Sequence, residues 1–300
     1  TATLNDAETH ALFRLIDELR RTGVALIYIS HRMAELRALA DTITILKDGL
    51  QVATRPMAGI EIDEIVRLMV GRAIEDFFPP AASTPPGAAL YSVSDGAVGR
   101  LSAISLTLHA GEIVGVAGLE GSGKAELARA MTGVLPFSHG AIRLFDGGGA
   151  PRSPREAARR GIGAIPEDRK GEGLGLVQSL RDNCALTMRA LAPFLGRASG
   201  GGRGRRPIDA LLDGVAVKAA DYAMPVGQLS GGNQQKVLFA RWSGIAPKVW
   251  IVIEPTRGID VGARAAIYAM LRSFAEAGAA VMVVSSDLME IIGLSDRICV

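Results

Sequence analysis

The sequence predicts an α/β fold with a mostly parallel sheet and a small antiparallel β layer near residues 90–110 and 141–145. Two observations carry this prediction. Short, wholly apolar runs at 249–253 and 279–284 are typical of strands buried on both faces of a parallel sheet. Segments with helical periodicity alternate with such runs, as they do in wound α/β layers.

The composition excludes several classes of protein. Apolar residues make up 48% of the 300 positions, enough for a core, and the length allows about two domains. The 33 basic and 31 acidic residues leave a charge of +2, which argues against a dedicated nucleic-acid binder. Two cysteines, Cys184 and Cys299, do not make a disulfide scaffold. No apolar run reaches the roughly 18 residues of a membrane helix, and no signal segment opens the chain. A cytoplasmic protein is therefore expected.

An internal repeat relates the two ends of the chain at an offset of 255 residues. Without any gap, 9 of 45 aligned positions are identical, among them Gly23 with Gly278 and Ser30 with Ser285. Gapless agreement over this length favours duplication over generic patterning. The chain then begins late in one copy and stops at the matching point of the next. Because residue 1 is Thr, we expect a processed chain or a piece of a longer one.

The first copy is expected to hold three helices and three strands. Hydrophobic periodicity and turn residues place the helices at 6–21, 32–39 and 62–70 and the strands at 25–29, 42–46 and 50–53. Residues 79–89, rich in proline and small side chains, are the best candidate for a linker. The predicted domains are therefore 1–78, the linker 79–89, and 90–300.

The second copy is expected to contain most of an α/β domain. Strands are predicted near 90–93, 101–108, 111–117, 249–253 and 279–284, with helices beginning at 124 and spanning 263–275. A helical insert is expected at about 175–225. Residues 196–206, rich in glycine and arginine, favour a solvated loop over a phosphate-binding patch.

A glycine-rich segment between a predicted strand and a predicted helix fits most of the phosphate-loop pattern G-x-x-x-x-G-K-[ST]. Its residues are Gly118, Leu119, Glu120, Gly121, Ser122, Gly123, Lys124 and Ala125. The glycines let backbone N–H groups converge on phosphate oxygens, and the lysine neutralises phosphate charge. The hydroxyl that normally holds Mg²⁺ is missing at Ala125. Standing alone, the segment could be an ordinary turn before a helix, but its setting points a helix N-terminus at an anion.

Two further segments suit phosphate chemistry. In LSGGNQQKV, residues 229–237, Ser230 and two glycines open a helix and offer a hydroxyl and free N–H groups. In VWIVIEPTRGID, residues 249–260, Glu254 ends a buried strand, where phosphate-transfer sites place a metal holder and a water-polarising base. The preceding position is Ile253, where an aspartate would be expected.

Together these segments resemble the ATP-binding-cassette (ABC) transporter ATPases. The nearest resemblance is to the duplicated ATP-binding subunit of bacterial monosaccharide importers of the ribose, galactose and xylose type. It rests on LSGGNQQKV, on AIPEDRKGEGL at 164–174, on EPTRGIDVGA at 254–263, and on ISHR and DGLQVATRP at 29–32 and 48–56. The resemblance covers essentially the whole chain and implies a P-loop NTPase-type sheet. Residues 1–78 would be the end of a first cassette, and 90–300 a second cassette lacking its C-terminal end.

The resemblance also implies roles for individual residues. The glycines at 118, 121 and 123 with Lys124 would be the Walker A loop. Ser230, Gly231, Gly232 and Gln234 would form the signature motif, Glu254 the Walker B glutamate, Glu167 the replacement for the Q-loop glutamine, and His31 the switch histidine of the first cassette. Gly258 and Asp260 would lie in the second D-loop, and Asn5 and Asp6 in the first.

Simpler interpretations stand beside these roles. His31 could be a polar residue at a strand end, Glu254 a capping carboxylate, and Glu167 an ion-pair partner of Arg169 or Lys170.

Three departures from the family pattern coincide at one site. Ala125 and Ile253 remove both usual Mg²⁺ holders, and Ser286 stands where the second cassette would carry its switch histidine. No metal ligand is therefore predicted in this cassette, although Mg²⁺ is expected with ATP in the intact protein. The departures predict a second phosphate site that cannot run metal-assisted hydrolysis. ATP binding without turnover, or a decayed gene, would also explain them.

The resemblance implies an ATP-hydrolysing subunit that energises monosaccharide import. Its partners would be a transmembrane sugar permease, the first-cassette core of the same polypeptide and, indirectly, a periplasmic or extracellular sugar-binding protein; no nucleic acid is expected. Its place would be peripheral, on the cytoplasmic face of the bacterial membrane, and the fragment alone is expected to be inactive. The alternatives are a non-catalytic structural cassette and a non-transport ABC ATPase.

Overall fold

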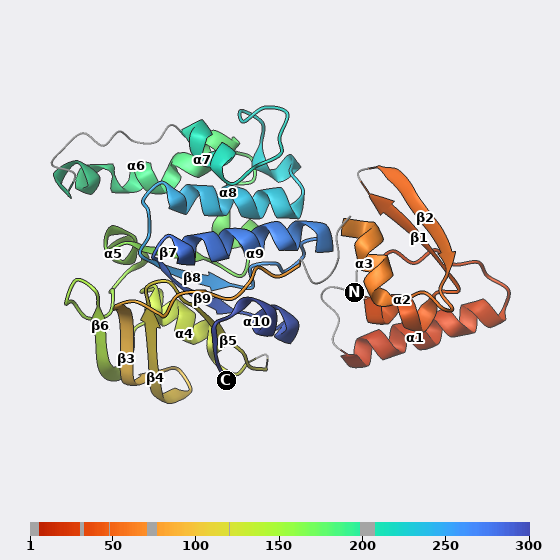
Figure 1. Cartoon of the computed structure of the whole chain (residues 1–300), viewed down its shortest axis with the longest axis horizontal. Coiled ribbons are helices and arrows are strands. Elements are labelled where there is room, and N and C mark those ends of the chain that lie inside the picture. Colours follow the sequence, from red (N-terminus) through yellow and green to blue (C-terminus); the bar gives the residue numbers. More distant parts are fainter. Residues whose placement is uncertain (1–5, 31–32, 48, 71–76, 120, 199–207) are drawn as a thin grey trace. The chain divides into compact units, whose positions relative to one another are not determined.

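The computed structural model describes every residue except 1–5, 31–32, 48, 71–76, 120 and 199–207 (Figure 1). The chain divides into two compact units. Unit 1 comprises residues 1–77 with 260–263, and unit 2 comprises 78–259 with 264–300.

Unit 2 is built on a five-stranded, wholly parallel sheet. Its strands are β5 (Ile113–Val116), β7 (Ile162–Ile165), β8 (Val249–Ile253), β9 (Ala280–Val284) and β10 (Arg297–Cys299), in the order β10-β5-β9-β8-β7. Every residue of β5, β8 and β9 is buried. The predicted α/β class and the predicted buried strands are thereby confirmed.

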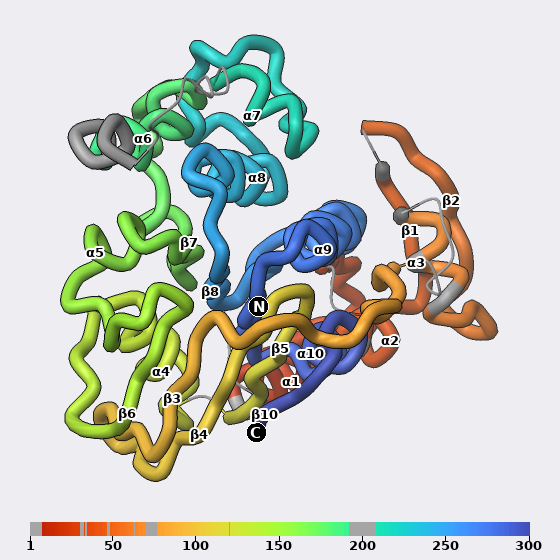
Figure 2. The backbone as a smooth tube through the Cα atoms, turned by 60° about the vertical axis from the view of Figure 1, so that its left-hand side comes forward, coloured from red at the N-terminus to blue at the C-terminus, as the bar shows by residue number. Residues whose placement is uncertain are grey.

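Helices cover both faces of this sheet, as Figures 1 and 2 show. They are α4 (Lys124–Met131), α8 (Gly231–Ser243), α9 (Val261–Glu276) and, at the edge, α10 (Leu288–Leu294). Alternation along β8 divides its side chains between the two faces. Ile251 joins the core that includes Leu127 and Met131 of α4, whereas Trp250 stacks on Phe274 of α9 with ring centroids 4.4 Å apart.

An antiparallel layer and a helical insert complete unit 2. The layer, expected near residues 90–110 and 141–145, contains β3 (Ala89–Val98), β4 (Leu101–His109) and β6 (His139–Leu144). Its strand order is β4-β3-β6. Between β6 and β7 lies the short helix α5 (Pro154–Arg159). The insert holds α6 (Leu180–Ala198) and α7 (Ile208–Gly214), which pack on α8. The turns η2 (Arg169–Gly173) and η3 (Val226–Gln228) flank it.

Unit 1 has a small core of its own. Its elements are α1 (Asp6–Arg21), α2 (Met33–Leu39), the antiparallel pair β1 (Thr42–Lys47) and β2 (Leu50–Pro56), and α3 (Ile62–Val70). The buried cluster consists of Leu36, Ile43, Ile45, Met57, Ile60 and Ile65.

Two sequence-based expectations were wrong in part. Residues 25–29 form no strand, and Ile27 and Ile29 are 95% and 92% exposed. A strand needs a hydrogen-bonded neighbour, and no described residue of unit 1 pairs with this segment. The loop predicted at 196–206 begins later, because α6 continues to Ala198; the rest of that prediction lies outside the described residues.

The element bounds repeat at the offset seen in the sequence. Helix α1 begins at Asp6 and α9 at Val261, 255 residues later, and both have 16 residues. Helix α2 begins at Met33 and α10 at Leu288, again 255 residues later, and both have seven residues. A buried glutamate and a serine bond each other in both copies, Glu35 with Ser30 and Glu290 with Ser285.

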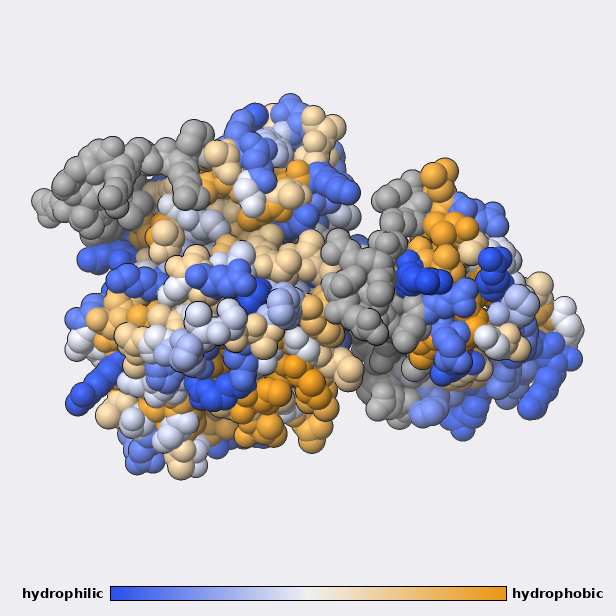
Figure 3. All heavy atoms as spheres, viewed as in Figure 1, coloured by the Kyte–Doolittle hydropathy of each residue, from blue (hydrophilic) through white to orange (hydrophobic). Residues whose placement is uncertain are grey.

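Among the described helices, none is long and apolar enough to cross a bilayer. Figure 3 shows apolar side chains gathered on unit 2 near α10. There Leu288, Met289 and Ile292 are 58%, 67% and 55% exposed.

Candidate nucleotide site

The predicted site segments follow neighbouring strands of the parallel sheet. The segment 117–123 follows β5, Glu254 follows β8, and Ser285 and Ser286 follow β9. Val116, Ile253 and Val284 pair in register at the ends of these strands. Since the strands are parallel, all three segments emerge at one edge, where open α/β sheets bind ligands.

The glycine-rich segment has a backbone that requires its glycines. Gly118, Gly121 and Gly123 have φ values of 155°, 77° and 96°, a region that L-residues with side chains rarely adopt. A Cβ at Gly123 would also lie 2.6 Å from Cγ of Leu101. The loop therefore turns tightly from β5 into α4, so that the N-terminus of α4 faces the edge of the sheet.

Lys124, Ser286 and Glu254 form one chain of hydrogen bonds. The buried ammonium of Lys124 donates to the Gly118 carbonyl at 2.7 Å, to the Ser285 carbonyl at 3.2 Å and to Oγ of Ser286 at 2.8 Å. The hydroxyl and the N–H of Ser286 both donate to Oε1 of Glu254, each at 2.7 Å. The sequence-predicted residues Lys124 and Glu254 are thus brought together through Ser286.

The same edge does not fit a magnesium ion. Ala125 and Ile253 offer no ligand atom, and Oε1 of Glu254 already accepts two hydrogen bonds. No group of three or more acidic, His or Cys side chains that could hold a metal occurs among the described residues. This edge therefore offers the ammonium of Lys124 to a negatively charged group and, among the described residues, no cluster of metal ligands.

The signature-like segment caps α8. Ser230 is the N-cap residue, yet its hydroxyl does not bond the helix N–H groups and accepts instead from Nδ2 of Asn233 at 3.1 Å. Gln234 is buried, and its Nε2 donates to the Leu229 carbonyl at 3.0 Å. Gly232 is buried in the first turn of the helix.

Glu167 follows β7 and forms an ion pair with Arg257. The alternative suggested by the sequence, a pair with Arg169 or Lys170, was wrong in its partner. Backbone folding explains this: Lys170 and Gly171 donate their N–H groups to Asp168, and Arg169 turns toward the 257–258 segment.

Sequence reasoning missed the role of Arg169 in the site. Its guanidinium contacts both the 257–258 carbonyls and Gln234. The only available signal was its place in the family-specific string 164–174. Burial lowers the pKa of Arg169 relative to a free arginine. His31, Glu120 and Asn5 lie outside the described residues, as does the side chain of Asp6.

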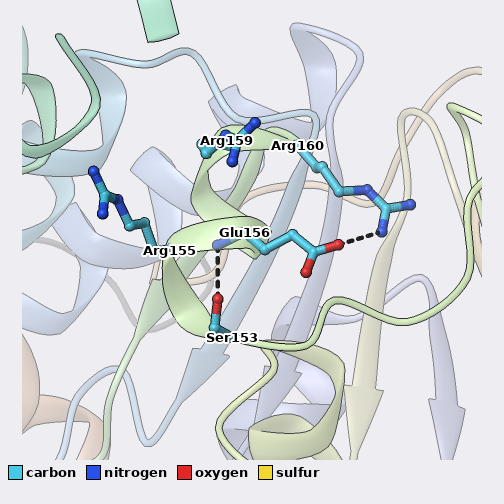
Figure 4. A pocket seen from close by; sticks show the side chains of 5 residues that line it. All are labelled: Ser153, Arg155, Glu156, Arg159 and Arg160. Atoms are coloured by element: carbon cyan, nitrogen blue, oxygen red, sulfur yellow. Dashed lines mark hydrogen bonds and ion pairs between the residues drawn. The ribbon is translucent and has the colours of Figure 1, made fainter. Parts of the chain in front are cut away.

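A pocket elsewhere in unit 2 is lined by Ser153, Arg155, Glu156, Arg159 and Arg160, around the short helix α5 (Figure 4). Ser153 caps α5 by accepting from the N–H of Glu156, and Glu156 pairs with Arg160 at 3.5 Å. Arg160 also holds Asp146 with two hydrogen bonds of 2.7 Å. These contacts account for the polar groups of Ser153, Glu156 and Arg160 within the fold.

Comparison with known proteins agrees with this geometry. Residues 101–257 match the ABC transporter family. The chain is 42% identical over 304 residues to the ribose import ATP-binding protein RbsA of Chelativorans sp. strain BNC1. It is 44% identical over 302 residues to RbsA 1 of Burkholderia cenocepacia strain HI2424. All of this chain is covered, but only 59% and 58% of those relatives.

Among solved structures, a nucleotide-free ATP-binding cassette from an ABC transporter aligns with a TM-score of 0.57 at 17% identity. The alignment covers 70% of this chain and 87% of that one. This likeness shows the fold. Because the family match spans more than half of the residues, the chain belongs to the ABC transporter family, in its ATP-binding part.

Proposed function

We propose that the chain is part of the ATP-binding subunit of a bacterial monosaccharide importer, whose ATP hydrolysis drives sugar uptake through a transmembrane permease. The observation that carries the proposal is the glycine-rich loop with Lys124 at the carboxyl edge of the parallel sheet. The naming of the relatives as ribose import proteins supports the substrate class. Binding to the permease would place the subunit peripherally at the cytoplasmic face of the membrane, with a sugar-binding protein acting on the other side.

We further propose that the chain combines parts of two cassettes. Residues 1–78 would be the end of the first, 79–89 the linker, and 90–300 the second. The equal lengths of α1 and α9 and of α2 and α10 support this division. So does the serine–glutamate pair that recurs in both copies.

Within the second cassette, the chain's own residues would bind phosphate without turning it over. Lys124 supplies positive charge, and the glycines at 118, 121 and 123 allow close backbone approach. The position of Glu254 after β8 suits a water-polarising base. Its carboxylate, however, accepts two hydrogen bonds from Ser286, whose hydroxyl also accepts from Lys124. A magnesium ion would supply charge neutralisation in the intact protein, at a site other than this one.

The test is ATP binding to the chain with and without EDTA. Calorimetry should show weak binding that hardly depends on Mg²⁺, because Ala125 and Ile253 supply no ligand for the metal. Lys124→Gln should weaken that binding, while Lys170→Gln, a change of an exposed lysine outside the loop, should not.

A tenfold gain of affinity with Mg²⁺, about 1.4 kcal/mol, would contradict the degenerate site. Absence of any binding by wild type would favour a purely structural cassette. Wild-type ATP hydrolysis by the longer protein that does not respond to its permease would favour a non-transport ATPase.

A further inference from the structure

Three of the five strings that carry the family resemblance meet at the guanidinium of Arg169. Arg169, from 164–174, donates from Nη1 to the Arg257 carbonyl at 2.5 Å and from Nη2 to the Gly258 carbonyl at 3.2 Å, both in 254–263. Its Nε approaches Oε1 of Gln234, in 229–237, at 3.4 Å. A single side chain therefore touches segments that are 65 to 89 residues away along the chain.

On one side, Arg169 meets the start of α8. Gln234, only 3% exposed, donates its N–H to the Ser230 carbonyl at 2.9 Å and its amide group to the Leu229 carbonyl at 3.0 Å. A Cβ on Gly231 would lie 2.8 Å from Nη2 of Arg169 and 2.9 Å from the Gly258 carbonyl oxygen. The glycine thus lets the helix start pack directly against the guanidinium and the turn.

On the other side, Arg169 meets the turn that follows β8. This turn is closed by hydrogen bonds from the Arg257 N–H to the Glu254 carbonyl at 3.2 Å and from the Ile259 N–H to the Thr256 carbonyl at 3.1 Å. Gly258 has a φ of 65°. The turn begins with Glu254, whose side chain is bonded to Ser286 and through it to Lys124.

The chemistry of these contacts requires arginine. All three acceptors are neutral oxygens. Arginine therefore suits this place because of the planar arrangement of its N–H donors, and not because it neutralises a negative charge. Partial burial of the side chain makes replacement of these bonds by water costly. A lysine would keep the charge but could not reach three acceptors in one plane.

We propose that Arg169 is a positioning residue, which fixes Ser230 and the start of α8 relative to the Glu254 turn. This inference rests on the proposed function, with Ser230 in the signature motif that the family resemblance implies. Losing the fork lets Ser230 and the Glu254 turn move independently. Both segments then keep their residues but lose their alignment with each other.

The first experiment measures hydrogen exchange in the 300-residue chain and needs no nucleotide. Arg169→Met and Arg169→Lys should both speed the exchange of the Gln234, Arg257 and Ile259 amides roughly tenfold, since bonds to charged donors are strong. Gly231→Ala, which pushes the guanidinium away, should give the same pattern. The matched control is Arg189→Met, because Arg189 is 65% exposed and bonds Asp182 at 2.9 Å.

Two results would overturn the proposal. One is that the three amides exchange in the Arg169 variants at the same rate as in the wild-type protein. The other is faster exchange that extends equally through β8, since this would show general loosening instead of local misalignment.

The second experiment measures ATPase kinetics in the longer two-cassette protein. Arg169→Met should lower kcat roughly tenfold and leave KM for ATP within about twofold, because alignment serves the transition state. Arg169→Lys should fail to restore kcat. An unchanged kcat, or a change confined to KM, contradicts the positioning role. Absence of ATPase in the wild-type protein rejects the proposed function, and the exchange experiment still decides the role of Arg169.

Discussion

Each of the three ammonium protons of Lys124 has a protein oxygen within reach. Two of these oxygens are backbone carbonyls and the third is the hydroxyl of Ser286. An incoming phosphate must displace at least one of them, so part of its interaction energy is offset by the bond that it breaks. This competition gives a physical reason for the weak binding that we expect.

The buried carboxyl of Glu290 bonds Ser285 and Thr256, beside the candidate site. We expect it to make the free energy of unfolding depend on pH. Burial raises its pKa, although bonds from Ser285, Thr256 and Tyr268 oppose the shift. The folded state therefore holds the proton at pH values where the unfolded carboxyl, with a pKa of about 4.3, has lost it. Stability that the wild type has below that value should decline as the pH rises toward the folded pKa.

Glu290→Gln, which cannot ionise, should therefore gain stability relative to wild type as the pH rises above about 4.3. Urea unfolding at several pH values measures the two slopes, and Glu126→Gln is the control because Glu126 is exposed. Identical pH slopes for wild type and Glu290→Gln would show that Glu290 does not titrate with folding.

At the scale of elements, hydrophobic periodicity predicted the helices and strands whose formation depends mainly on their own sequence. The bounds of α1 and α3 agree with the prediction, and β8 was recognised from its apolar run. The segment 25–29 has the same apolar character as β9, which pairs with β5 and β8, but no described strand of unit 1 lies beside it. Strand formation depends on such neighbours, which a local pattern does not contain.

Only those residues of the candidate site that a known sequence pattern requires could be predicted from the sequence. The glycines and Lys124 could be recognised because the phosphate-loop pattern requires them at fixed spacing. Glu254 could be recognised because it directly follows an apolar strand. The bridging hydroxyl of Ser286 and the fork of Arg169 depend on strands and turns that are distant in sequence. Their contacts follow from the sheet order, which local reasoning does not supply.

Limited proteolysis should distinguish the two units. Unit 1 buries few large apolar side chains and exposes Ile27 and Ile29, so we expect it to open at a low free energy. Residues from Ala82 onward are held by unit 2, since the N–H of Ala82 bonds Asp296 at 2.9 Å and that of Gly87 bonds the Ala110 carbonyl at 2.7 Å. Cleavage should therefore fall near the start of the 79–89 segment.

The N-terminal piece should then be degraded first, as mass spectrometry of a time course would show. Equal lifetimes for both pieces would contradict the expectation that unit 1 opens more readily than unit 2.

For the whole molecule, we propose that the site residues belong to two composite sites, each formed by the phosphate loop of one cassette and the signature serine of the other. The proposed second-cassette phosphate loop lacks its metal partners, while the segment 229–235 keeps its serine and glycines. His31 would belong with the phosphate loop of the first cassette. We therefore predict that hydrolysis occurs between that loop with His31 and the Ser230 face, and that the Lys124 site is a clamp.

Steady-state ATPase assays of the full transporter test this assignment. Ser230→Arg should abolish turnover, and His31→Ala should reduce it by about 10²–10³, the usual effect of losing one preorganised contact. Lys124→Ala should leave most of the activity. If Lys124→Ala is as damaging as Ser230→Arg, the asymmetric assignment is wrong.

The left-handed backbone of Glu254, with a φ of 49°, has a consequence for protein engineering. Such a conformation costs a residue with a side chain about 1–3 kcal/mol, which glycine avoids. Ala103, Ala216 and Ala246 share it, with φ values of 54°, 51° and 47°. Glycine at those three positions relieves strain and removes only a methyl group. The same replacement at Glu254 deletes the carboxylate that holds Ser286, so a search for stability alone would select against the site.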